Sequence, residues 1–185
     1  MASPSGRRGT TSSLGPLVLG LVLGGVTSAL GFWLISGLVR PVWAPARIGL
    51  LVVIALAALA DELFGTRWRW PQNARQVPQA IRHRAPRVAM LQFGFELGTG
   101  LRTFVTAKAP YVVVSVVLLA GLPIVEALAL GAGFGAGRAL MPLTRTWHQA
   151  TSDWDHRLER ASRWVKVTTT ALAGCAAVWL AVAAA

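Results

Sequence analysis

The sequence predicts an all-α fold, a polytopic transmembrane helix bundle, and two observations carry that prediction. The first is that long uncharged apolar runs recur along the 185 residues, separated by segments rich in arginine. The second is composition, because 54% of the residues are hydrophobic and the mean hydropathy is +0.55, a value that soluble domains seldom reach. A run of about 18 or more apolar residues is long enough to cross the ~30 Å hydrocarbon core of a bilayer as a helix.

We expect a single membrane domain over residues 1–185 with about five spans, one of them a proline-broken helix. The spans are expected at residues 14–39, 46–64, 90–121, 122–141 and 167–183, with the third broken near Pro110. Cytoplasmic loops are expected at 65–87 and 142–166. Two crossings within 90–121 would give six spans, but the basic cluster before the last span would then lie outside the cytoplasm, against the usual charge bias.

The distribution of arginine predicts the orientation. The net charge is +11, and most of the basic residues flank apolar runs. With the N-terminus in the cytoplasm, nearly all basic residues fall inside and only Arg40 and Arg47 face out. We therefore expect a multi-pass protein of the cell inner membrane with a cytoplasmic N-terminus. Membrane topology explains the basic charge, so no nucleic-acid partner is expected.

The segment before the last span has a helical pattern. One stripe of that helix would hold Trp147, Thr151, Trp154, Leu158, Ala161 and Val165, which recur at spacings of four and three. A basic amphipathic helix beside a span is typical of one that lies along the inner membrane surface. A docking site for a partner is the alternative interpretation.

Polar residues in the third expected span are candidates for a substrate or ion path. They are Gln92, Glu96, Thr99, Arg102, Thr103, Thr106, Lys108 and Pro110. Five of them follow one another at intervals of four and three and would share one helix face, namely Gln92, Glu96, Thr99, Thr103 and Thr106. A charge at mid-depth costs at least about 2.5–3.5 kcal/mol, so Glu96 is expected to face a cavity or a partner. The alternative is a structural role at the inner interface, paired with Arg87 or Arg102.

Two further features concern the break in the third expected span and the end of the second. Proline inside a span frees the carbonyl four residues before it, so Pro110 would kink the helix at Thr106, and broken helices often line transporter sites. Asp61 and Glu62 are expected to cap the inner end of the second span and to face the arginines that follow.

Glycines four residues apart predict close helix contacts. The pairs are Gly20 and Gly24, Gly94 and Gly98, Gly131 and Gly135, and Gly133 and Gly137. Small residues at this spacing let helices approach closely. We expect packing within the chain first and dimerisation second.

The sequence contains no recognisable catalytic constellation. It has no phosphate-binding glycine loop, no nucleophile elbow and no His-Glu-x-x-His motif. Cys175 is the only cysteine, so a cysteine metal cluster is excluded, and the three histidines are scattered. We therefore expect a protein that is not an enzyme, without catalytic residues, metal or cofactor.

The second half of the chain resembles a known family. Residues 93–121, FGFELGTGLRTFVTAKAPYVVVSVVLLAG, read as a glycine-rich helix that meets a proline and continues as an apolar helix. A glycine-rich span, the basic stretch RLERASRWVK and a final span with a central Gly174 follow. This order resembles the C-terminal three spans of the DsbD/CcdA thiol-disulfide transmembrane reductases. That family carries a cysteine three residues before the kink proline, where this chain has Ala107, so the resemblance implies a related scaffold without the reaction.

Two functions remain open from the sequence. The one we favour is a non-catalytic membrane scaffold or subunit that acts through helix contacts with a membrane-protein partner or in a homo-oligomer. The other is a small transporter or permease-like protein with a path around Glu96. In both cases the lipid bilayer is the surrounding medium.

Overall fold

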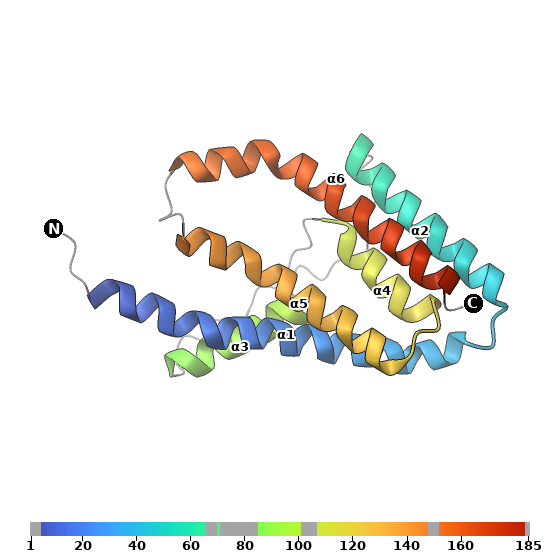
Figure 1. The fold of residues 1–185 in the computed structure, drawn as a ribbon, viewed down its shortest axis with the longest axis horizontal. Helices are drawn as coiled ribbons and strands as arrows, with labels where there is room; N and C mark the ends of the chain where they lie inside the picture. The colour runs from blue at the N-terminus through green and yellow to red at the C-terminus, as the bar shows by residue number, and fades with distance from the viewer. Residues whose placement is uncertain (1–4, 66–69, 71–84, 101–106, 148–151, 184–185) are drawn as a thin grey trace.

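The structure, a computed structural model, describes residues 5–65, 70, 85–100, 107–147 and 152–183. These residues form helices α1 (Ser5–Val39), α2 (Ala44–Phe64), α3 (Pro86–Thr99), α4 (Ala109–Leu119), α5 (Ile124–Trp147) and α6 (Ser152–Ala183) (Figure 1). No strand occurs within these ranges. The all-α helix bundle that the sequence predicts is confirmed.

Within the described ranges, three helical segments are long and apolar enough to cross a membrane, namely Leu14–Val39, Ile124–Thr144 and Glu159–Ala183. The chain is therefore a helical membrane protein. Helix α2 has 21 residues. Helix α4 is apolar but has only 11 residues, so it covers about 16 Å, roughly half of the hydrocarbon thickness. The five-span count and the cytoplasmic N-terminus stay predictions.

The helices form two layers that alternate along the chain. Helices α1, α3 and α5 pack together in the lower part of Figure 1, and α2, α4 and α6 pack together in the upper part. Helix α4 also contacts α1, so it joins the two layers. Consecutive helices thus belong to different layers.

Glycines set the spacing between α1 and α3. A Cβ atom added at Gly20 or Gly24 would overlap backbone atoms of α3, and one added at Gly94 or Gly98 would overlap the backbone of α1 at Leu17 or Leu21. The two backbones therefore touch, as small residues four apart allow.

The contact between α1 and α5 is built in the same way. A Cβ atom at Gly25 would overlap the carbonyl of Gly131, and one at Gly135 would overlap the carbonyl of Leu21. The predicted packing within the chain is confirmed for three of the four glycine pairs. Gly133 and Gly137 instead face open space on the outer side of α5.

The second layer is held by larger apolar side chains. Its core joins Leu51 of α2, Val112 and Val116 of α4, Leu122, and Ala177 of α6, all of which are buried. The β-branched valines of α4 fill the space between the alanines of α2 and α6. A short helix that is apolar on every side is typical of such a buried position.

The structure divides residues 90–121, expected as one broken crossing, into two helices. Helix α3 ends at Thr99 because Gly100 adopts a φ of 66°, the left-handed conformation that commonly ends helices. Helix α4 begins at Ala109 with Pro110 in its first turn. Proline suits that turn because its missing N–H would have no helical partner there. The kink expected at Pro110 is therefore a helix start, and the break begins at Gly100.

The loop expected at 142–166 is helical at both ends. Helix α5 continues through Pro142 to Trp147, and α6 runs from Ser152 to Ala183 without interruption. The helix expected to lie along the membrane surface is therefore an extension of the last helix. The physical reason is that α6 contains no proline and has Gly174 as its only glycine, so nothing in the sequence ends it at Lys166.

Candidate functional site

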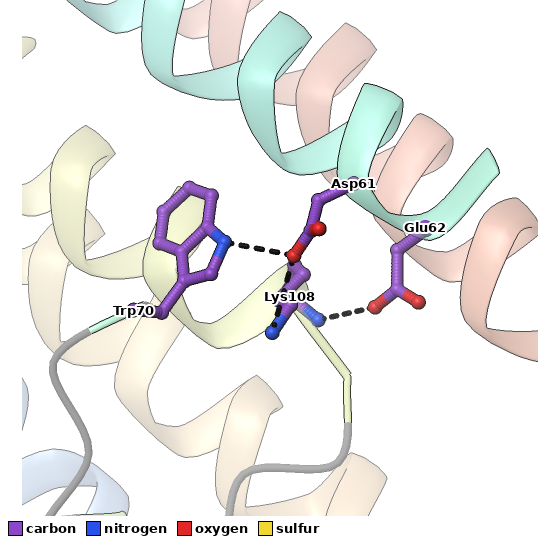
Figure 2. Close-up of polar contacts among 4 residues, drawn as sticks. All are labelled: Asp61, Glu62, Trp70 and Lys108. Carbon is purple, nitrogen blue, oxygen red and sulfur yellow. Dashed lines mark hydrogen bonds and ion pairs between the residues drawn. The ribbon is translucent and has the colours of Figure 1, made fainter. Parts of the chain in front are cut away.

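The densest group of polar contacts lies where α2 ends and α4 begins (Figure 2). The side chain of Asp61 is only 4% exposed. Its Oδ2 accepts a hydrogen bond from Trp70 Nε1 at 2.9 Å and forms an ion pair with Lys108 Nζ at 3.4 Å. Because a buried carboxylate is costly unless it is paired, Lys108 compensates the charge of Asp61.

Glu62 accepts a hydrogen bond from the backbone at the start of α4. The backbone N–H of Lys108, the N-cap residue of α4, donates to Glu62 Oε1 at 2.7 Å. The first N–H groups of a helix lack helical partners, and its N-terminus carries a partial positive charge. A carboxylate from α2 therefore stabilises the start of α4.

Aromatic rings cover the same cluster. Lys108 Nζ lies 5.8 Å from the centroid of the Trp70 ring. The rings of Trp70 and Tyr111 have centroids 4.9 Å apart, at an interplanar angle of 37°. Trp70 thus contacts Lys108 with its ring face while its Nε1 donates to Asp61. A cation over an aromatic ring contributes about 0.5–2 kcal/mol.

Arginine side chains lie at the opposite, C-terminal end of α4. Arg47 of α2 donates from Nη1 to the carbonyl oxygen of Leu119 at 3.0 Å. Trp33 of α1 donates from Nε1 to the carbonyl oxygen of Leu122 at 3.0 Å, and the Arg40 guanidinium lies 5.8 Å from the Trp33 ring centroid. The last carbonyls of a helix carry partial negative charge, so a cation there is favourable. Helix α2 therefore supplies the groups that hold α4 at both ends.

We expect Arg47→Gln to lower the free energy of unfolding by about 1.5–3 kcal/mol, because it removes a charge-assisted hydrogen bond to the end of α4. Thermal unfolding in detergent, followed by circular dichroism, measures this effect. Arg87→Gln on the exposed first turn of α3 is the matched control. Equal melting temperatures for the two variants would contradict a capping role for Arg47.

The candidate path residues fall into separate places. Gln92 Nε2 donates to Glu96 Oε1 at 3.3 Å, and Thr99 Oγ1 donates to the Glu96 carbonyl oxygen at 2.8 Å. Ser28 of α1 donates to the Thr99 carbonyl oxygen at 3.0 Å. These three candidates share the last turns of α3. The buried Gln92 Oε1 accepts no hydrogen bond from the described residues.

The other candidates do not extend that face within the described ranges. Arg102, Thr103 and Thr106 lie outside the described residues. Lys108 and Pro110 belong to the start of α4, where Lys108 contacts α2. The continuous polar face expected from Gln92 to Thr106 requires one helix, whereas α3 ends at Thr99.

The sequence indicates roles for Asp61, Glu62 and Lys108 but not the contacts between them, and neither Trp70 nor Tyr111 is among its candidate site residues. Asp61 and Glu62 were expected to face the arginines after them, and five of these, from Arg67 to Arg84, lie outside the described residues. The contact that the structure shows joins Glu62 to a residue 46 positions away. No group of three or more His, Cys, Asp or Glu side chains suited to a metal occurs in the described part of the chain.

Comparison with known proteins finds one informative similarity. No protein-family model matches the chain, and no solved structure matches it. The chain is 36% identical over 129 residues to the methylamine utilization protein MauF of Paracoccus versutus. The match covers 69% of this chain and 44% of MauF, so the chain spans less than half the length of that relative.

Proposed function

We propose that this chain is a non-catalytic membrane subunit that supports methylamine utilization through helix contacts. The observation that carries the proposal is the 36% identity to MauF over 129 residues, since the name of that relative links it to methylamine use. The proposal concerns the helical region that the two proteins share, because the match covers 44% of MauF.

The geometry favours a scaffold over a transport path. Four charged residues make the contacts that join α2 to α4, namely Asp61, Glu62, Lys108 and Arg47. Backbone contact at the glycines leaves no room for a path between α1 and α3. The charged groups are therefore used to fix the helices, and the exposed apolar faces of α2 and α6 are available for lipid or for a partner helix.

Deletion of the gene from its native host is expected to abolish or strongly slow growth on methylamine as the sole nitrogen source. Growth on ammonium should be unchanged, because the proposed role is specific to methylamine utilization. Growth curves on the two nitrogen sources measure the effect, and the wild-type gene supplied on a plasmid should restore growth. Equal growth of the deletion strain and its parent on methylamine would contradict the proposal.

A small transporter is the second candidate function, and the Gln92–Glu96 pair in α3 is the observation that favours it. A buried carboxylate in an apolar bundle is often part of an ion or substrate path. The scaffold proposal instead treats Glu96 as a helix-packing residue whose charge is not needed.

Complementation with Glu96→Gln separates the two functions. For a scaffold we expect this variant to restore growth on methylamine, since glutamine keeps the size of the side chain and an acceptor for Gln92. For a transporter, growth and uptake of labelled methylamine should both fall. Thiol labelling of Thr99→Cys in a Cys175→Ala background adds an independent test, because a water-filled path would expose the new cysteine and a closed bundle would protect it.

A further inference from the structure

A pocket of about 400 Å³ opens at the surface where the C-terminal end of α2 meets α6. Its lining consists of Asp61, Glu62, Leu63, Phe64 and Gly65 from the end of α2, with Ser162, Arg163 and Lys166 from α6. Arg163 Nη2 donates to the Leu63 carbonyl oxygen at 2.8 Å, which fixes its guanidinium beside the end of α2. The volume falls within the range of about 300–1,000 Å³ that is usual for small-molecule sites.

The pocket lies at the boundary between charged and apolar chain. Lys166 directly precedes the uncharged residues 167–183, and Asp61 directly follows the uncharged residues 48–60. Two large apolar side chains near the pocket are turned outward, with Phe64 78% exposed and Trp164 67% exposed. Tryptophan and charged residues at the end of an apolar helix are typical of headgroup depth. The ligand that this place favours is therefore a membrane phospholipid.

The charges of the pocket are of both signs. Arg163 and Lys166 stand one turn apart on α6 and supply the positive side. On the negative side, Asp61 already contacts Lys108 and Trp70. Glu62 uses Oε1 to accept the Lys108 N–H, and its carboxylate has a second oxygen. A purely anionic headgroup would be repelled by Glu62, whereas a headgroup with a phosphate and a primary ammonium matches both sides.

We propose that this pocket binds the headgroup of phosphatidylethanolamine. The phosphate contacts Arg163 and Lys166, and the ammonium donates to Glu62. The acyl chains follow the outer faces of α2 and α6, where Leu56 and Leu172 are exposed. A choline headgroup carries no N–H group to donate to Glu62, and a glycerol headgroup carries no positive charge. The site therefore distinguishes among three common phospholipids.

Native mass spectrometry of the full chain in detergent tests the proposal. Phosphatidylethanolamine, phosphatidylglycerol and phosphatidylcholine with identical acyl chains are titrated in turn, and the bound fraction is measured for each lipid. We expect phosphatidylethanolamine to bind most tightly to the wild-type chain. Equal binding of the three lipids would overturn the proposal, and tighter binding of phosphatidylglycerol would overturn the assignment of Glu62 to the ammonium.

Two variants locate the site. Lys166→Gln removes one charge-assisted contact to phosphate and should weaken phosphatidylethanolamine binding about tenfold. Arg87→Gln removes the same charge from the other layer and should leave binding unchanged. Equal affinities for these two variants would overturn the site.

Glu62→Gln tests the negative side alone. Glutamine keeps an oxygen acceptor for the Lys108 N–H but loses the charge, so we expect the preference for phosphatidylethanolamine over phosphatidylglycerol to disappear. Circular dichroism confirms that each variant retains its helices. The comparison of three lipids on the wild-type chain requires no variant, so it decides the question even where a substitution prevents folding.

Discussion

Replacing Gly24 with alanine is expected to lower the free energy of unfolding by about 1–3 kcal/mol, the usual cost of forcing extra atoms into a packed interior. A Cβ atom at this position would overlap the Phe95 carbonyl oxygen and would lie 2.8 Å from the Thr99 backbone nitrogen. Both obstacles are backbone atoms of α3, so rotation of a side chain cannot relieve the overlap and the two helices must separate. Thermal unfolding in detergent, followed by circular dichroism, measures the change.

Gly137→Ala is the matched control for that experiment. Gly137 is exposed on α5, and nothing lies within 4 Å of an added Cβ atom. Alanine is favoured over glycine within a helix by about 0.5–1 kcal/mol, so this variant should be as stable as the wild type or slightly more stable. If the two alanine variants melted at the same temperature, close packing at Gly24 would not hold α1 against α3.

Replacing Lys108 with methionine is expected to lower the free energy of unfolding by about 3–5 kcal/mol, the usual cost of breaking a buried ion pair by removing one of its two members. The side chain of Asp61 is 4% exposed and that of Lys108 is 16% exposed, so water compensates little of the lost ion pair. Trp70 Nε1 would still donate to Asp61, but a neutral donor does not replace the ammonium charge of Lys108. The melting temperature in detergent measures the loss.

The double variant Asp61→Asn with Lys108→Met should recover much of that stability. Asparagine keeps an acceptor for Trp70 Nε1, and both charges of the Asp61–Lys108 ion pair are removed together. A double-mutant cycle over the four proteins gives the coupling between the two positions. Stability losses that simply add would contradict the ion pair as the reason for the effect of Lys108→Met.

The sequence predicts the helix bundle well because its strongest signal is physical and local. The first expected span, 14–39, lies within α1, where no charge interrupts a run that is long enough to cross a bilayer. The pairs Gly20 and Gly24, and Gly94 and Gly98, indicate close packing because only small residues allow two backbones to touch. The spacing of the glycines does not predict which helix is the partner, and only the folded structure shows it.

At 90–121 and 142–166 the structure adds where the helices begin and end, which the sequence pattern does not predict. Spacing predicts a shared face only where the helix is continuous, and Gly100 ends α3 between Thr99 and Thr103. Pro110 predicts a break in the helix, whereas in the structure it suits the first turn of α4. At Lys166 a change from charged to apolar residues suggested a boundary, yet polarity alone does not end a helix.

The partners in the Asp61–Lys108 cluster illustrate what a single sequence does not reveal. Lys108 is a candidate in the sequence because it is a charged residue within an expected span, and the structure shows its partner on α2. The backbone N–H of Lys108 donates a hydrogen bond to Glu62, which lies 46 residues earlier in the sequence. No local sequence pattern connects two residues so far apart. The path role of Glu96 and its neighbours stays a prediction that the variants above will test.

The alternation of layers along the chain has a consequence for biosynthesis. Helix α1 ends at residue 39 and its glycine-matched neighbour α3 ends at residue 99, so 99 − 39 = 60 further residues must be synthesised before the two can meet. At about 5–20 residues per second this takes roughly 3–12 s. Throughout that interval the surface of α1 at Gly20 and Gly24 lacks the helix that packs against it in the final fold. The order in which the helices are synthesised therefore differs from the order in which they pack against one another.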